Sequence, residues 1–121
     1  MKKVMIVEDQ LILATLFEAY VGKAGFQSVG IATTCTEAME IFDRENPDLV
    51  LMDIQIDGDK DGIETIKILL EKHIFPFVFL TGNNDEATRN KAMETHPNAF
   101  LLKPVSRDVF IETISKILAA A

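Results

Sequence analysis

The stretch that decides the fold is PDLVLMDIQIDGDKDGIET, residues 47–65. Four apolar residues run directly into an aspartate, Asp53, and three further aspartates follow within the next eight positions. A short, continuous apolar run is typical of a strand that is covered on both faces of a sheet. Ending such a strand on a carboxylate is unfavourable, because the charge has to leave water. The stretch therefore predicts a buried strand that ends, at the edge of a sheet, in a carboxylate with a functional role.

Similar apolar runs recur along the chain and alternate with amphipathic segments of helix length. The expected strands cover residues 4–7, 29–32, 49–52, 77–80 and 99–102. The expected helices cover residues 11–23, 34–46, 63–72 and 85–95, with a last helix that begins after Ser106. This alternation predicts an α/β fold, with helices on both faces of a parallel sheet. Right-handed crossovers leave few topologies, and among these we expect a flavodoxin-like (βα)5 three-layer sandwich with strand order 2-1-3-4-5.

The fourth expected helix differs from the others in how little apolar area it offers. Its apolar residues are Ala87, Ala92 and Met93. Because little area can be buried, its docking on the sheet should be weak. Two explanations stay open at this point, an ordinary exposed helix and a movable element.

Composition limits the classes of protein to which the chain can belong. The 121 residues are 48% hydrophobic with a net charge of -7, which predicts one folded domain over residues 1–121 and no second domain. An acidic chain lacks the basic footprint of nucleic-acid binding, so no direct nucleic-acid binding is expected. No apolar stretch approaches the ~20 residues needed to cross a bilayer, so no membrane role is expected. The single cysteine, Cys35, is interpreted as a packing residue in a cytoplasmic protein.

Polar residues follow four of the expected strands at the point where each strand ends. Glu8 and Asp9 follow the first strand, Asp53 the third, Thr81 the fourth and Lys103 the fifth. The carboxyl ends of parallel strands share one edge of the sheet, and ligands bind there where the strand order reverses. Adjacent first and third strands would bring the three acids close together.

Three acids in one pocket repel, and either protonation or a cation has to relieve that repulsion. Carboxylates that leave room for water and phosphate oxygens suit Mg²⁺. A lysine and a hydroxyl nearby complete a site for a phosphoryl group, with a carboxylate as a candidate nucleophile. Each residue alone has an ordinary explanation as a turn, cap or surface residue, and only the combination is informative.

At this point the sequence resembles the receiver domain of bacterial two-component response regulators, over essentially the whole chain. The matching stretches are VMIVEDQ, PDLVLMDIQ, DGIE, FLTG and AFLLKP. The resemblance implies that Asp53 is the phosphoacceptor. It further implies a Mg²⁺ site formed by Asp53, by Asp9 directly, by Glu8 through water, and by the backbone carbonyl of Gln55.

The same resemblance assigns roles to three residues on the last two strands. Lys103 would bond the phosphoryl group, and Thr81 would move to hydrogen-bond one of its oxygens. Phe100 would be an aromatic switch that turns inward as Thr81 moves; plain core packing is the alternative explanation for this phenylalanine.

The implied function is signalling and not enzymatic turnover. The phosphoryl donor would be a sensor histidine kinase or a histidine phosphotransfer protein, and slow self-dephosphorylation would reset the domain. The output would use the face formed by the fourth helix, fifth strand and fifth helix, which could also pair two copies of the chain as a homodimer.

Three rival interpretations fit the sequence less well. DGDKDG, residues 57–62, matches the first half of a calcium-binding EF-hand loop, but Ile68 stands where that loop needs a glutamate. A phosphatase with an aspartyl nucleophile would commonly carry a second acid two positions after Asp53, where this chain has Gln55. An interaction-only receiver would lack the acceptor, a metal-binding acid or the lysine, and the sequence retains them all.

Overall fold

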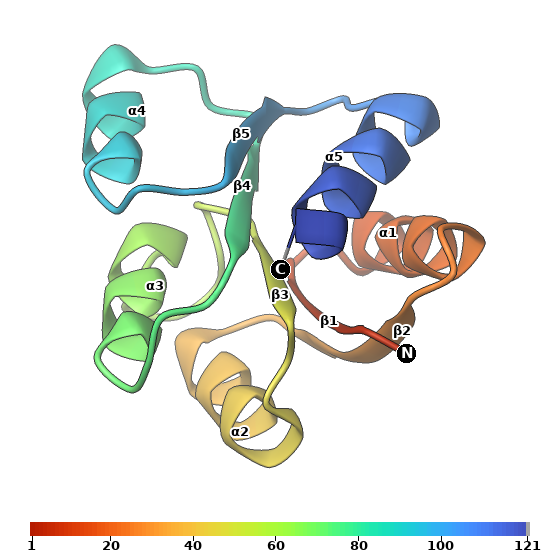
Figure 1. Cartoon of the computed structure of the whole chain (residues 1–121). Coiled ribbons are helices and arrows are strands. Elements are labelled where there is room, and N and C mark those ends of the chain that lie inside the picture. Colours follow the sequence, from red (N-terminus) through yellow and green to blue (C-terminus); the bar gives the residue numbers. More distant parts are fainter. Residues whose placement is uncertain (121) are drawn as a thin grey trace.

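The computed structural model describes residues 1–120 of the chain, and these residues form an α/β sandwich (Figure 1). The parallel sheet has the order β2-β1-β3-β4-β5, so the predicted flavodoxin-like topology is confirmed. The strands are β1 (Lys3–Val7), β2 (Gln27–Ala32), β3 (Leu49–Met52), β4 (Phe77–Thr81) and β5 (Ala99–Leu102). Each lies within two residues of its predicted bounds.

The helices that connect the strands cover both faces of this sheet. They are α1 (Leu11–Lys23), α2 (Cys35–Glu45), α3 (Gly62–Leu70), α4 (Glu86–Met93) and α5 (Arg107–Ala120). Helices α3 and α4 end two residues earlier than predicted. The cap of α4 is Asp85, whose carboxylate accepts a hydrogen bond from the Thr88 amide at 3.0 Å.

Two apolar cores lie on opposite faces of the sheet, and each strand contributes alternate residues to them. On β1, Met5 and Val7 pack into the core under α2 and α3, whereas Val4 and Ile6 pack into the core under α1 and α5. Because β1, β3 and β4 are buried on both faces, their continuous apolar runs are explained.

Helix α4 is thinly anchored, as its sequence predicted. Ala92 is its buried residue, while Met93 is 43% exposed. Figure 1 shows α4 standing out at the β5 edge of the sheet. Little apolar area therefore opposes its movement.

Residues 1–120 include no helix whose length and apolarity would let it span a bilayer.

Candidate phosphoryl-binding site

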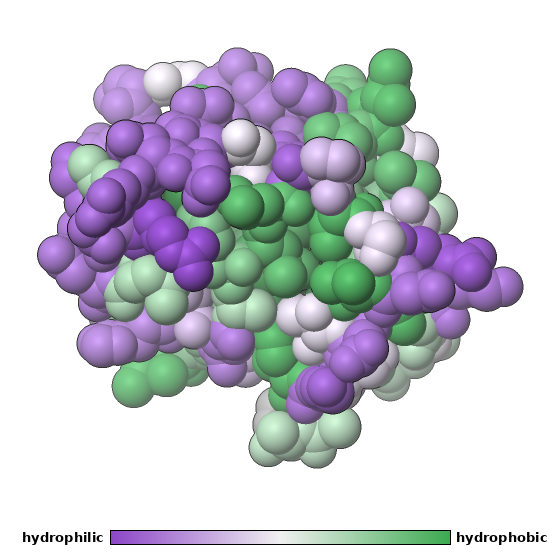
Figure 2. Space-filling view, turned by 90° about the horizontal axis from the view of Figure 1, so that it is seen from above, coloured by the Kyte–Doolittle hydropathy of each residue, from purple (hydrophilic) through white to green (hydrophobic). Residues whose placement is uncertain are grey.

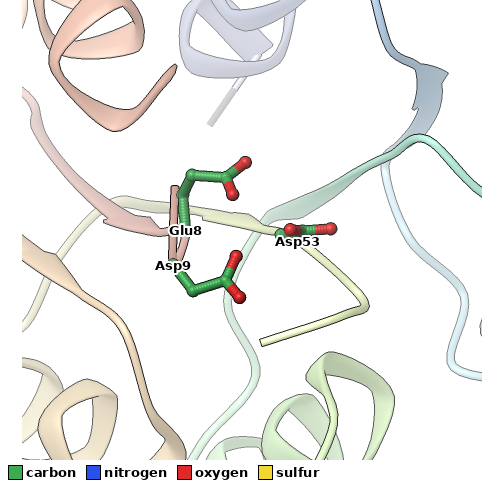
Figure 3. A group of neighbouring side chains, drawn as sticks. All are labelled: Glu8, Asp9 and Asp53. Atoms are coloured by element: carbon green, nitrogen blue, oxygen red, sulfur yellow. The ribbon is translucent and has the colours of Figure 1, made fainter. Parts of the chain in front are cut away.

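The carboxyl ends of β1 and β3 bring three acids together, as the sequence predicted. Glu8, Asp9 and Asp53 each place a carboxylate oxygen within 4.8 Å of the others. Glu8 and Asp53 are buried, and Asp9 is half-buried. Figure 3 shows the three carboxylates on adjacent strand ends, with Asp9 pointing toward Asp53. They meet because β1 and β3 pair in register from Val4–Leu49 to Val7–Met52, and the Asp53 amide donates to the Val7 carbonyl at 2.9 Å.

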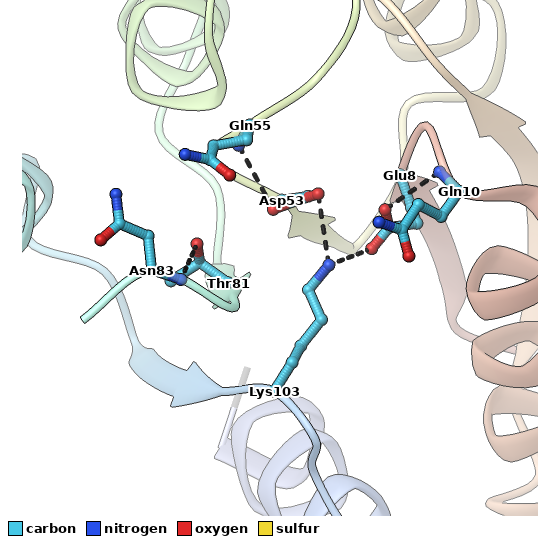
Figure 4. Close-up of polar contacts among 7 residues, drawn as sticks. All are labelled: Glu8, Gln10, Asp53, Gln55, Thr81, Asn83 and Lys103. Atoms are coloured by element: carbon cyan, nitrogen blue, oxygen red, sulfur yellow. Dashed lines mark hydrogen bonds and ion pairs between the residues drawn. The ribbon is translucent and has the colours of Figure 1, made fainter. Parts of the chain in front are cut away.

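Lys103 reaches into this acidic group from the end of β5. Its ammonium lies 2.6 Å from Glu8 Oε1 and 3.2 Å from Asp53 Oδ2, with 13% of the side chain exposed. Figure 4 shows the lysine extended between the two carboxylates. The Lys103 amide also donates to the Thr81 carbonyl at 2.8 Å, which ties the residue to the end of β4. A buried cation therefore offsets part of the negative charge that the acids concentrate.

The electrostatics of the site follow from this burial. Burial raises the pKa of Glu8, and the nearby Asp53 charge adds to the effect, while the hydrogen bond from Lys103 opposes it. Burial alone would lower the pKa of Lys103, but its hydrogen bond to Glu8 and the charges of Asp53 and Glu8 outweigh it, so the pKa is raised. The lysine is thus held in its charged form.

The two oxygens of Asp53 have different partners. Oδ2 faces Lys103, whereas Oδ1 accepts a hydrogen bond from the Gln55 amide at 3.3 Å. Gln55 is exposed at the rim, on the loop that leads to α3. Asp53 is thereby fixed on the wall of a cavity of about 420 Å³.

This cavity is open to solvent and has polar and apolar walls. Its lining residues are Asp9, Gln10, Leu13, Asp53, Gln55, Gly82, Lys103 and Pro104. Gln10, Leu13, Gly82 and Pro104 were not among the predicted site residues. Gln10, Gly82 and Pro104 stand in the motifs VMIVEDQ, FLTG and AFLLKP, whereas nothing in the sequence indicated that Leu13, in the first turn of α1, would form a wall.

Thr81 and Phe100 lie close to the site but outside this cavity. The Thr81 side chain is fully buried, and its hydroxyl accepts a hydrogen bond from the Asn83 amide at 3.2 Å. Figure 4 shows this pair separated from the Lys103 cluster. Phe100 is half-buried, with its ring 6.3 Å from that of Phe79 in an edge-to-face contact.

One neighbour of Phe100 was not predicted from the sequence. The guanidinium of Arg89, on α4, lies 4.7 Å from the centre of the Phe100 ring. The charge therefore sits at cation–π distance over the ring. No local pattern could have indicated this contact, because it joins two elements whose relative placement the sequence does not specify.

The donor set fits Mg²⁺. Hard divalent cations of this size take carboxylate and carbonyl oxygens together with water. Glu8, Asp9 and Asp53 supply carboxylates within reach of one another, and the open cavity beside them leaves room for water. The rival calcium loop is less well supported, because the Asp61 carboxylate instead caps α3 through the Glu64 amide at 2.8 Å.

Comparison with known families agrees with this arrangement. The family model described as "Response regulator receiver domain" matches residues 4–115. The chain belongs to the response regulator receiver domain family. The resemblance inferred from the motifs is thus confirmed, and the chain is a two-component signalling domain.

Two relatives of this receiver domain are transcriptional regulatory proteins. YxdJ of Bacillus subtilis (strain 168) is 31% identical over 121 residues, which cover 100% of this chain and 52% of YxdJ. PdtaR of Mycobacterium tuberculosis (strain ATCC 25618 / H37Rv) is 30% identical over 113 residues, covering 93% of this chain and 55% of PdtaR. The receiver domain therefore spans about half the length of each relative.

Solved receiver structures are similar over nearly the whole chain. The BeF3-activated N-terminal receiver domain of Klebsiella pneumoniae RstA is 30% identical with a TM-score of 0.88, covering 97% of this chain and 98% of that one. The signal receiver domain of a modulated diguanylate cyclase from Desulfovibrio desulfuricans G20 is 29% identical with a TM-score of 0.89, covering 98% and 94%.

Proposed function

We propose that this receiver domain accepts a phosphoryl group on Asp53 in a Mg²⁺-dependent reaction. The observation that carries the proposal is the position of the Asp53 carboxylate, on the cavity wall between the Lys103 ammonium and the Gln55 amide. Both oxygens are held by donors from different elements, so the carboxylate faces an incoming group in a defined orientation.

The donor is a phosphohistidine on a sensor histidine kinase or a histidine phosphotransfer protein. An Asp53 oxygen attacks the phosphorus, a P–O bond forms, the P–N bond breaks, and the imidazole leaves and takes up a proton. Bound Mg²⁺, held by Asp53, Asp9, the Gln55 carbonyl and, through water, Glu8, would supply neutralising charge for the phosphoryl oxygens. Lys103 binds a phosphoryl oxygen, and this requires it to loosen its bond to Glu8.

Water later hydrolyses the acyl phosphate, so the domain is a switch that resets slowly and not a turnover enzyme.

Two large apolar residues on α1 lie exposed beside the cavity. Leu11 and Ile12 are 61% and 88% exposed, next to the cavity wall formed by Gln10 and Leu13. Their apolar surface is available to the donor protein, since large exposed apolar groups next to a site are typical of docking surfaces.

The output face is formed by α4, β5 and α5. Seen from above in Figure 2, apolar side chains gather between hydrophilic surfaces. On this face Leu102 is 40% exposed and Val109 is 48% exposed. Phosphorylation shifts the population toward a state in which Thr81 bonds the phosphoryl group and Phe100 turns inward, so that α4 repositions. The altered face then binds a downstream partner or a second copy of the chain.

The direct test is incubation with acetyl phosphate and Mg²⁺, followed by intact mass measurement. The wild type should gain one phosphoryl group, EDTA should prevent the gain, and Asp53→Asn should remain unlabelled. Asp57→Asn, an exposed aspartate in the following loop, is the matched control and should be labelled normally. Labelling of Asp53→Asn equal to that of the wild type would refute the assignment.

A further inference from the structure

Gly62, the first residue of α3, packs against the backbone at the end of β3 without any intervening side chain. A Cβ built on Gly62 would lie 2.1 Å from the Asp53 carbonyl oxygen and 2.8 Å from Ile54 Cα. Real Cβ atoms essentially never approach other heavy atoms within 3.0 Å, and the atoms in the way are backbone. Gly62 itself has no left-handed backbone conformation to require a glycine. The glycine is therefore required by space and not by its own torsion angles.

One hydrogen bond crosses this contact, and two more brace the first turn of α3. The Gly62 amide donates to the Ile54 carbonyl at 2.7 Å. The preceding residue, Asp61, forms a capping box with Glu64, with distances of 3.0 and 2.8 Å. Because Ile54 and Ile63 are also buried, the first turn of α3 is locked onto the peptide that follows the acceptor aspartate.

We propose that Gly62 is a positioning residue for the phosphorylation site, an inference that rests on the function proposed above. Its close approach fixes the peptides of residues 53–55, which carry the Asp53 carboxylate and the Gln55 amide and carbonyl. An added methyl group would need to push the Asp53 backbone and α3 apart by about 1.3 Å to reach an ordinary contact distance. Displacement by ~1 Å at a reacting group is enough to slow a reaction about a hundredfold.

The test compares Gly62→Ala with Gly22→Ala. Gly22 lies within α1, and a Cβ there would meet nothing within 4 Å, so it is a matched glycine control. Mg²⁺ affinity is measured by calorimetry, labelling by acetyl phosphate through intact mass, and folding by circular dichroism and urea denaturation. We expect Gly62→Ala to be folded, to bind Mg²⁺ at least tenfold more weakly and to be labelled at least tenfold more slowly. Gly22→Ala should match the wild type in both.

A purely structural role would change stability without changing the site. Ile114→Val, a core substitution on α5, lowers the urea midpoint and should leave Mg²⁺ affinity unchanged. If Gly62→Ala behaves in the same way, with a lower midpoint and wild-type Mg²⁺ affinity, the positioning role is overturned.

If Gly62→Ala does not fold, Asp61→Ala provides a second test of the positioning role. This change removes the capping box that holds the first turn of α3, and it adds no atom near Asp53. We expect a two- to fivefold loss of Mg²⁺ affinity, and wild-type affinity would overturn the proposal. A wild type that binds Mg²⁺ but is never labelled would refute the proposed function, while the Mg²⁺ titrations would still report on Gly62.

Discussion

The ammonium of Lys103 lies 2.6 Å from Glu8 Oε1, although 95 residues separate the two in the sequence. The same ammonium lies 3.2 Å from Asp53 Oδ2, so it serves two buried carboxylates at once. Removal of one partner of a buried ion pair is strongly destabilising, because the remaining charge stays buried without compensation. The lysine therefore stabilises the fold as well as the site.

Lys103→Met should lower the free energy of unfolding by about 2–4 kcal/mol in EDTA. Mg²⁺ should restore part of this loss, because the cation supplies positive charge to the same acids. Urea denaturation followed by circular dichroism, with and without Mg²⁺, measures both effects. Lys67→Met, an exposed lysine on α3, is the control. An equal loss of stability in the two variants would contradict the prediction.

Asp9→Asn should have the opposite effect on stability. The substitution keeps the shape of the side chain and removes its repulsion with Glu8 and Asp53. We expect the free energy of unfolding without Mg²⁺ to rise by ~1 kcal/mol, since Asp9 is only half-buried and its charge is partly screened. Added Mg²⁺ should then stabilise the variant less than the wild type. Asp59→Asn is the control, because the Asp59 side chain is 93% exposed. It should change neither the free energy of unfolding nor the stabilisation by Mg²⁺. Similar behaviour of the two variants would rule out charge repulsion among the three acids.

Arg89→Ala tests the contact between α4 and Phe100. Loss of the guanidinium over the ring should lower the free energy of unfolding by ~0.5–1 kcal/mol. Because α4 buries little else, amide hydrogen exchange over residues 86–93 should accelerate more than elsewhere in the chain. Lys91→Ala on the same helix removes a charge without a ring contact, and it should not accelerate exchange to the same extent. Unchanged exchange in Arg89→Ala would show that the contact does not hold the helix.

Glu37→Gln should reveal a pH-dependent contribution at the start of α2. Hydrogen bonds from the Thr33 amide and hydroxyl, at 2.7 and 2.8 Å, lower the pKa of Glu37. An acid whose pKa is lowered in the folded state adds stability above its unfolded pKa, and that stability is lost as the pH falls through the folded pKa. The variant should therefore be less stable than the wild type at pH 7, and the difference should shrink toward pH 3. Urea denaturation at both pH values checks this.

Glu40→Gln, an exposed glutamate on the same helix, is the control for that experiment. It should show no comparable pH dependence. A Glu37→Gln difference that stays constant from pH 7 to pH 3 would mean that the hydrogen bonds do not depend on the charge.

The sequence predicted the strands because these depend on short-range patterns, and right-handed crossovers left few possible strand orders. Continuous apolar runs mark strands that are buried on both faces, and residues just past parallel strands have to share one edge. The sequence alone therefore predicted one shared site for Glu8, Asp9, Asp53 and Lys103, because each follows the end of a predicted strand. The length of α4 and its cap at Asp85 were harder to predict, since several neighbouring side chains could have capped the helix.

By itself, the sequence determined the alternation of strands and helices and placed Glu8, Asp9 and Lys103 at the same sheet edge as Asp53. The hydrophobic period and the residues that follow each strand are properties of the chain alone. The tertiary structure decided which partners those side chains select. It placed Lys103 on Glu8 as well as Asp53, turned the Thr81 hydroxyl toward the Asn83 amide, and set Gly62 against the Asp53 peptide. Such contacts depend on how helices dock and which rotamers fit, and these are settled only when segments distant in sequence pack together.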